Sequence, residues 1–264
     1  MKRYRILSFD FDSRVHAFTD ETDPEKIRQA GERLKFHVGE ANLDLKIKNF
    51  MDLGPKPMSV AAFHNRFLEQ IRDSYAIGSY YPALTGACAL GERILNHLML
   101  KLRDEHRSSP EYKNIYRKDS FDFWPMMIDC LEAWTDLLPD AVDKFRTLNA
   151  KRNMAIHFNI EVDQNDRSLA LEAIHLIQDI VRIQFSSFGT QPWYFCIPGE
   201  MYIRRKWETK PFVKHILIPN ALHVSPTHAV KIGAHGFEID GPDGCSGDEI
   251  TDEEFIALRH AGKK

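Results

Sequence analysis

The sequence predicts an α+β protein in which a bundle of four or more helices precedes a small β-rich C-terminal module. Between residues 59 and 188, apolar residues recur with the 3.6-residue period of helices. After Gly189 the chain turns to short aromatic and β-branched segments separated by Pro and Gly, a pattern typical of strands. We therefore divide the chain into an N-terminal strand and helix segment (1–58), a helical bundle (59–190) and a β-rich module with an acidic tail (191–264).

The N-terminal segment is expected to begin with a strand over 4–18, which could join the C-terminal strands in one sheet. Asp23 and Pro24 have the residue types of a helix start, so we expect a helix that runs to Gly39. The alternation of apolar and polar residues over 43–48 predicts a second short strand. The Gly-Pro-Lys-Pro sequence at 54–57 is a break, and it sets the first domain boundary.

The bundle is expected to hold four long helices, with a polar connector between the first and the second. Small residues in the first half of the first helix indicate that another helix packs closely against it. The helices are predicted over 82–103, 119–138, 140–157 and 167–188.

The C-terminal module is expected to contain short strands and a poorly ordered tail. The tail, residues 238–254, holds eight acidic residues and no Lys or Arg, a composition that favours a solvated segment. The strands are predicted at 193–197, 200–203, 212–218 and 229–232.

Composition narrows the functional class. The chain has 264 residues with 35 Lys and Arg against 38 Asp and Glu, so its overall charge does not indicate a nucleic-acid-binding protein. No apolar run approaches the roughly 18 residues of a membrane span, and the basic start reaches Asp10 too early for a secretory signal. The four cysteines form no Cys-x-x-Cys pair, which argues against a zinc ribbon or a disulfide framework. We expect a cytoplasmic protein that has no membrane partner and needs no metal or cofactor.

The stretch most indicative of chemistry lies at the end of the third predicted helix. Arg152 and Asn153 are followed, after three residues, by His157. At about 100° per residue, Asn153 and His157 lie about 40° apart on a helix, whereas Arg152 and His157 lie about 140° apart. One straight helix therefore cannot join Arg152 and His157 in a compact site. A symmetric second copy of the helix would bring both residues of both chains around one cleft.

This arrangement resembles the Arg-x4–6-His motif of the HEPN superfamily (higher eukaryotes and prokaryotes nucleotide-binding domain), including the polar residue after the arginine. The resemblance covers about 130 residues of the chain: Tyr80-Tyr81-Pro82 before an Ala-rich helix, the helix ending before Pro139, the motif helix and a long closing helix. It implies a metal-independent endoribonuclease that acts as a homodimer on RNA, in a toxin–antitoxin or antiviral defence system. An antitoxin or regulatory subunit would be a further partner.

The residue types suit that reaction. An unperturbed imidazole has a pKa of about 6.5 and can accept a proton from a ribose 2′-hydroxyl at neutral pH. The planar guanidinium of Arg152 suits phosphoryl oxygens that gain negative charge, and Asn153 could hold the imidazole or the phosphate by hydrogen bonds. The expected products are a 2′,3′-cyclic phosphate and a 5′-hydroxyl. The alternative in a different class is a non-catalytic HEPN scaffold that dimerises and binds nucleotide or a protein, and the motif could also be an ordinary helix end.

Other residues point more weakly to function. The candidate RNA-binding residues are Lys151 and the basic run Arg204, Arg205 and Lys206. The basic run lies among aromatic residues that either stack on bases or form the core of the sheet. Asp10 and Asp12 resemble the Asp-x-Asp opening of haloacid dehalogenase-like phosphatases, although the alternating β and α units of that fold are missing. Three histidines of the C-terminal module lack a ligand partner at a recognised interval, so no metal site is expected there: His223, His228 and His235.

Overall fold

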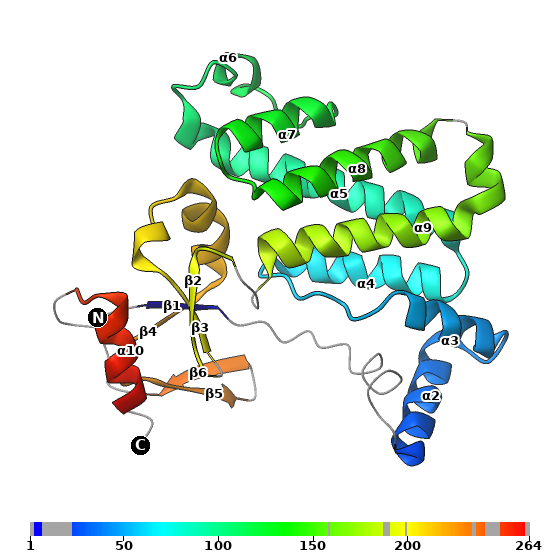
Figure 1. The fold of residues 1–264 in the computed structure, drawn as a ribbon, viewed down its shortest axis with the longest axis horizontal. Helices are drawn as coiled ribbons and strands as arrows, with labels where there is room; N and C mark the ends of the chain where they lie inside the picture. Colours follow the sequence, from blue (N-terminus) through cyan, green and yellow to red (C-terminus); the bar gives the residue numbers. More distant parts are fainter. Residues whose placement is uncertain are drawn as a thin grey trace. The chain divides into compact units, whose positions relative to one another are not determined.

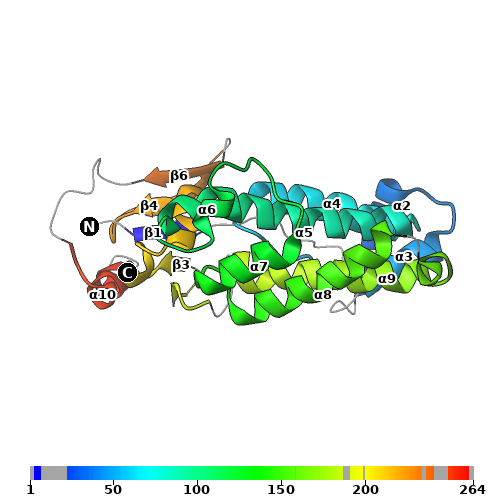
Figure 2. The ribbon, with the colours of Figure 1, turned by 90° about the horizontal axis from the view of Figure 1, so that it is seen from above.

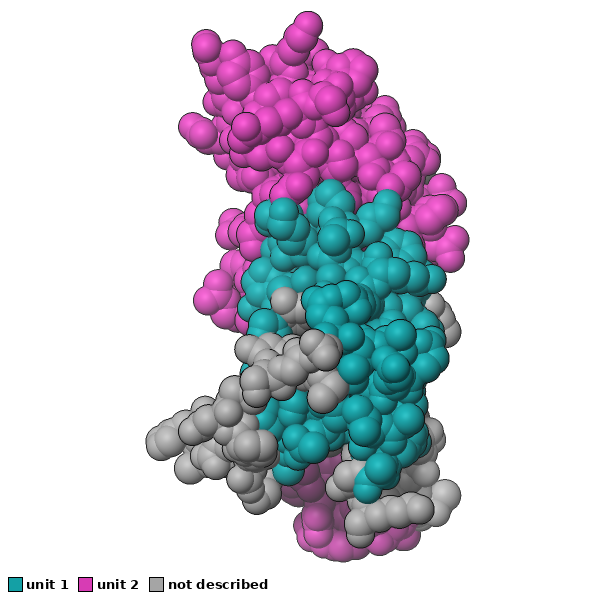
Figure 3. All heavy atoms as spheres, turned by 90° about the vertical axis from the view of Figure 1, so that its left-hand side faces the viewer, with its two compact units in different colours: residues 1–8, 190–264 teal, residues 9–189 magenta. Residues whose placement is uncertain are grey.

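The computed structural model describes residues 3–6, 23–157, 159–186, 191–198, 200–233, 236–240 and 249–261. The chain forms two compact units: residues 9–189 make a helical unit, and residues 1–8 with 190–264 make a β-containing unit (Figure 3). The class of a helical protein with a small β part is thus confirmed. No described helix is long and apolar enough to cross a membrane. Asp10, Asp12 and His235 lie outside the described residues.

In the helical unit, α5 packs against α4, α7, α8 and α9, and these helices are arranged side by side along much of their length (Figures 1 and 2). Gly91 of α5 permits a close approach of α7 and α8, because a Cβ atom there would lie 2.6 Å from the Trp124 ring of α7 and 2.8 Å from Leu148 of α8. The helices are α2 (Pro24–Val38), α3 (Leu43–Asp52), α4 (Ala62–Ala76), α5 (Tyr80–Leu102), α6 (Tyr112–Ile115), α7 (Trp124–Ala133), α8 (Pro139–Ile156) and α9 (Ile160–Ile180), with short helical turns at Arg103–His106 and Val181–Phe185.

Several helix ends follow the local sequence. The side chain of Asp23 accepts a hydrogen bond from the backbone N–H of Glu25, and Pro24 begins α2. Pro139 begins α8, where a missing N–H costs nothing. The predicted helix over 119–138 is reduced to α7, while the fourth predicted helix begins earlier, at Ile160, with a kink at Asn165.

The short strand predicted over 43–48 is wrong, because these residues begin helix α3. Phe50 of α3 packs in one cluster with Leu34 of α2 and Ala76 of α4, and Ile47 lies against it. Ile47 and Phe50 are three residues apart, so helical spacing buries them on one face. An alternation over six residues was too short to distinguish this arrangement from a strand.

The β-containing unit has a four-stranded antiparallel sheet in the order β2-β3-β1-β4 and a separate β5-β6 hairpin. The N-terminal strand pairs on both sides, with Arg5 opposite Tyr202 of β3 and Leu222 of β4. The strands are β1 (Arg3–Ile6), β2 (Tyr194–Ile197), β3 (Glu200–Ile203), β4 (Leu222–Val224), β5 (Ala229–Gly233) and β6 (Gly236–Asp240), and a helix, α10 (Asp252–Ala261), follows them.

The predicted strand over 212–218 is also wrong: Val213–Leu217 and Ile218–Asn220 form helical turns. The side chains of Val213, Ile216 and Leu217 are buried at helical spacing. The preference of the β-branched Val213 and Ile216 for a strand was outweighed by their burial on one side of a helical turn.

The acidic tail is not wholly without structure. Gly236–Asp240 forms β6, and Asp252–Ala261 forms α10. The backbone N–H of Glu254 donates to the Thr251 hydroxyl (3.1 Å), and the carboxylate of Glu254 accepts from the N–H of Thr251 (2.7 Å). This capping box is visible in the sequence as Thr-x-x-Glu, and the acidic first turn suits the helix dipole. Phe255 of α10 is fully buried in a cluster with Phe195, Tyr202 and Val224.

Candidate functional site

The predicted catalytic residues lie at the C-terminal end of α8. Arg152 and Asn153 belong to the last turn of the helix, whereas His157 is the residue that caps it, with extended backbone angles of φ −91° and ψ 145°. The N–H of His157 donates to the carbonyl of Asn153 (3.2 Å), which anchors the backbone at this point. The side chains of Asn153 and His157 are exposed. The helix therefore ends one residue earlier than predicted, and the imidazole extends from a non-helical residue.

Arg152 is held by two side chains that the sequence pattern did not assign to the site. Its Nε and a terminal nitrogen contact Glu92 Oε2 of α5 at 3.1 and 3.0 Å. The same carboxylate oxygen accepts a hydrogen bond from Trp124 Nε1 of α7 (3.1 Å). The guanidinium carbon of Arg152 lies 5.8 Å from the centre of the Trp124 ring, within the range of a cation–π contact. Three helices thus fix the position of this guanidinium.

In the sequence, Glu92 stands out only as a charged residue within a mainly apolar helix. It follows Gly91 in α5, a helix whose buried positions are otherwise mainly apolar or small. A carboxylate at a partly buried position needs a hydrogen-bonding or charged partner. The sequence indicates that Glu92 needs such a partner. Only the packing of α5 against α7 and α8 shows that the partners are Trp124 and Arg152.

His157 and Arg152 are not joined within one chain. The imidazole of His157 forms no hydrogen bond or ion pair with another residue in the described part of the chain. Next to it, the Tyr81 hydroxyl of α5 donates to the carbonyl of Ala155 (3.3 Å). Tyr81, Ile156 and Ile160 are exposed large apolar residues at this end of the bundle. The immediate surroundings of His157 are therefore open and partly apolar.

A polar cavity of about 550 Å³ lies on the other side of Glu92. Helix α5 lines it with Glu92, Arg93, Asn96 and His97, and the segment 118–122 forms the opposite wall. The amide of Asn96 donates to the carbonyl of Phe121 (2.8 Å) and accepts from its N–H (2.7 Å), which fastens that segment to α5. Burial lowers the pKa of His97, and the charges of Arg93 and Lys101 lower it further.

The candidate RNA-binding residues have internal partners or belong to the β-containing unit. Lys151 forms an ion pair with Glu172 of α9. Arg204 Nε donates to the carbonyl of Tyr194 (2.6 Å), and Arg205 forms an ion pair with Glu249. Lys206 is exposed. The aromatic side chains around this run are largely buried, which agrees with their interpretation as sheet core: Trp193, Tyr194, Phe195, Tyr202 and Phe212.

Among the described residues, one group has the composition of a metal site: His37 of α2 with Glu69 and Asp73 of α4. His37 Nε2 lies 2.9 Å from Asp73 Oδ1, and the nearly buried Lys56 ammonium forms an ion pair with Glu69. A divalent cation would have to replace both interactions, so these residues are arranged as an ion-pair network.

Of His223, His228 and His235, the structure describes the first two. His228 is buried, and its Nδ1 accepts a hydrogen bond from the N–H of Ser225 (3.1 Å). His223 is an exposed residue of β4. Neither belongs to the His, Cys and carboxylate group found among the described residues.

Comparison with known proteins identifies no relative of the chain: no family model, no curated protein and no solved structure matches it.

Proposed function

We propose that the protein is a metal-independent endoribonuclease of the HEPN type, with Arg152, Asn153 and His157 as its catalytic residues. The observation that supports this most is the fixed Arg152 guanidinium beside an exposed histidine at the same helix end. A positioned cation and an open imidazole are the groups that cleavage of an RNA strand by its own 2′-hydroxyl requires.

In the proposed reaction, His157 accepts the proton of a ribose 2′-hydroxyl. The 2′-oxygen attacks the adjacent phosphorus, and the bond from phosphorus to the 5′-oxygen breaks. The leaving 5′-oxygen takes up a proton from water, and His157 returns its proton to the solvent, which gives a 2′,3′-cyclic phosphate and a 5′-hydroxyl. Arg152 stabilises the negative charge that gathers on the phosphoryl oxygens, because its donors are oriented before the reaction.

The proposed active form is a homodimer. Within one chain no described interaction links His157 to Arg152, so a second copy has to bring the guanidinium and imidazole of both chains around one phosphate. The exposed Tyr81, Ile156 and Ile160 provide apolar surface at the same end of the bundle. A two-fold symmetric contact would use this surface on both chains.

The biological setting proposed is RNA cleavage in the cytoplasm as part of a toxin–antitoxin or antiviral defence system, with an antitoxin or regulatory subunit as an additional partner. This setting follows from the family resemblance of the motif and its surrounding helices.

The test is cleavage of a long structured RNA in the presence of EDTA. We expect His157→Ala to reduce the rate roughly 10²- to 10⁴-fold, the usual contribution of a general base. Arg152→Ala should reduce it about 10²- to 10³-fold, as for loss of a charge-stabilising donor. Arg146→Ala on the same helix, and His260→Ala on α10, are matched controls that should cleave at the wild-type rate. Cleavage that needs a metal, or ends other than a cyclic phosphate, would contradict the proposal.

One observation favours the second candidate, a non-catalytic HEPN scaffold. Glu92 already satisfies part of the Arg152 guanidinium, as it would if the arginine had only a structural role. Glu92→Gln separates the two candidates. A ribonuclease should lose turnover when the arginine is no longer held, with a change in kcat rather than KM. A scaffold should show no cleavage before or after the change and should respond only in stability.

A further inference from the structure

The outer face of α4 and α5 carries three cations without a carboxylate partner in the part of the chain that the structure describes. Arg66, Arg93 and Lys101 are exposed, and none of them forms an ion pair with another described residue. By contrast, the cations of α8 pair with acidic residues: Lys144, Arg146, Lys151 and Arg152. The α4–α5 face is therefore positively charged, whereas the cations of α8 are neutralised by acidic partners.

An aromatic ring lies beside two of these three cations. The guanidinium carbons of Arg66 and Arg93 lie 4.9 and 5.0 Å from the centre of the Phe67 ring. One turn away on α4, Phe63 stacks on His97 of α5, with ring centres 4.5 Å apart. Arg93, His97 and Lys101 are spaced four residues apart, so they follow one side of α5 over about 12 Å. The result is a row of positioned cationic and aromatic groups.

The electrostatic environment along this row is positive. Burial lowers the pKa of His97, and the nearby positive charges of Arg93 and Lys101 lower it further. Asp119 and Asp122 line the polar cavity from the segment that faces α5, and Glu92 is paired with Arg152. An anionic chain would therefore approach along the α4–α5 side.

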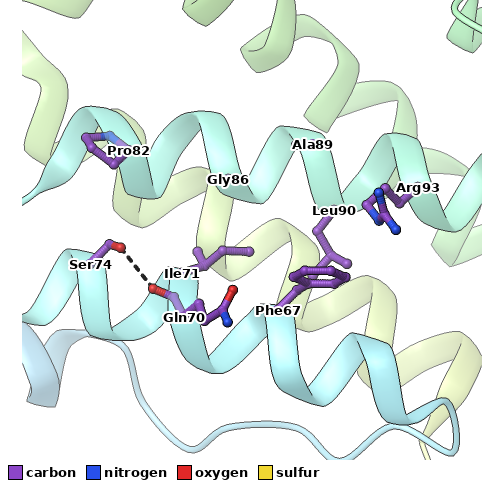
Figure 4. Close-up of a pocket in the computed structure, with 9 residues that line it drawn as sticks. All are labelled: Phe67, Gln70, Ile71, Ser74, Pro82, Gly86, Ala89, Leu90 and Arg93. Atoms are coloured by element: carbon purple, nitrogen blue, oxygen red, sulfur yellow. Dashed lines mark hydrogen bonds between the residues drawn. The ribbon is translucent and has the colours of Figure 1, made fainter.

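A groove of about 290 Å³ lies beside the row, between α4 and α5. Ile71, Gly86 and Leu90 contribute apolar surface, and the exposed Gln70 lies at the rim. Figure 4 shows Phe67 and Arg93 toward one end of the groove and Pro82 and Ser74 toward the other. The volume is close to the lower limit of small-ligand pockets, roughly 300 Å³, which suits one flat base better than a whole nucleotide.

We propose that the α4–α5 face binds single-stranded RNA, with an unpaired base in the groove and flanking phosphates at Arg66, Arg93 and Lys101. The choice of RNA rests on the proposed ribonuclease function; the binding surface itself rests on the charges and the groove. An acidic protein segment would pair with the cations but would leave the groove without a planar occupant.

This surface adjoins the candidate catalytic site through consecutive residues of α5. Glu92 contacts Arg152, while the next residue, Arg93, lines both the groove and the polar cavity. A strand that contacts Arg93 would thus pass close to the residue that holds the catalytic arginine.

The test measures binding rather than cleavage. The full chain with His157→Ala is titrated with a fluorescent single-stranded RNA at several salt concentrations. In this background, Arg93→Gln with Lys101→Gln removes two cations that would bind phosphates. At 0.1 M salt, each cation removed should weaken single-strand binding about fivefold, so the pair should weaken it about 25-fold and reduce the salt slope by about 1.4. Arg33→Gln with Lys48→Gln is the matched control, with wild-type affinity expected. It removes from α2 and α3 two exposed cations that form no ion pair with another described residue.

A second variant tests the groove. Ala89 is exposed on α5 and lines the groove, so Ala89→Trp should fill it without disturbing the core. The loss of one stacked base should weaken single-strand binding about tenfold while leaving the salt slope unchanged.

Three results would overturn the inference: wild-type affinity in the Arg93 and Lys101 variant, equally tight binding of duplex RNA, or equally tight binding of polyglutamate. None of these results concerns the cleavage chemistry. Conversely, a wild-type chain that binds single-stranded RNA through this face but never cleaves it would support the surface and contradict the ribonuclease proposal.

Discussion

At the scale of single residues, the pairing of ionisable groups decides what each can do. Glu92 gathers Trp124 and Arg152 at one carboxylate oxygen and so turns a flexible arginine into a positioned one. His64 is the opposite case, a histidine fully enclosed between Phe63 and Phe185. Its Nδ1 lies 2.7 Å from the Ser59 hydroxyl, which also accepts the N–H of Ala61. This geometry suits a neutral imidazole that accepts a hydrogen bond from Ser59.

The enclosed histidine predicts that stability depends on pH. Burial lowers the pKa of His64 to about 3, with a smaller contribution from His97. In the unfolded chain the pKa of this histidine is about 6.5. Between about pH 3 and pH 6.5, the unfolded state therefore binds a proton that the folded state does not bind. The contribution of His64 to the free energy of unfolding is therefore fully present above about pH 6.5. Below that value the free energy of unfolding falls by about 1.4 kcal/mol for each pH unit, until about pH 3.

Urea unfolding at pH 7 and pH 5 measures this effect. The free energy of unfolding should fall by about 2 kcal/mol more in the wild type than in His64→Gln. His260→Gln changes an exposed histidine and should keep the wild-type difference. If His64→Gln shows the same pH dependence as the wild type, the histidine is not held neutral.

At the scale of elements, helix α5 organises the helical unit because it contacts four other helices. Gly91 is central to this role, since Trp124 and Leu148 occupy the space where a side chain would begin. Trp124 also binds Glu92, so the close approach that packs α5 against α7 and α8 places the Arg152 partner as well.

We predict that Gly91→Ala destabilises the protein by about 1 to 3 kcal/mol, the usual cost of overpacking a core. The matched control is Gly31→Ala in α2, where nothing lies within 4 Å of the added Cβ. That change should stabilise by about 0.4 to 1 kcal/mol, because alanine favours a helix. Denaturant unfolding of both variants provides the comparison, and equal stabilities would show that α5 can shift to accept a methyl group.

At the scale of the whole molecule, the β-containing unit has a hydrophobic cluster of its own. The core of the β-containing unit joins residues distant in the sequence: Phe195 and Tyr202 from the sheet and Phe255 from α10. Arg259 of α10 also forms an ion pair with Glu200 of β3 at 2.9 Å, where both side chains are almost fully buried. The end of the acidic tail is therefore part of this unit.

This arrangement predicts that Phe255→Ala destabilises the β-containing unit by about 3 to 5 kcal/mol, through loss of buried area and formation of a cavity. Amide hydrogen exchange should become faster in β2 and β3 but stay unchanged in α5 and α9. Phe36→Ala is the control, because the side chain of Phe36 is 94% exposed and its removal should change stability by less than about 0.5 kcal/mol. Slow exchange in β2 and β3 of Phe255→Ala would show that α10 does not complete this core.

The sequence by itself determined the long helices, because an apolar stripe repeated over several turns admits one periodicity, as in α5 and α8. It also determined the start of α2 and the position of the Arg152–His157 motif at a helix end. The sequence pattern did not determine the short segments 43–48 and 213–217. These segments are helical because burial of Phe50 and Leu217 outweighed the local preference for a strand. Only the tertiary structure decided which groups meet. The pairing of Arg152 with Glu92, and of the α4 aromatic rings with the α5 cations, joins residues on different helices, and their distances depend on packing that no local pattern encodes.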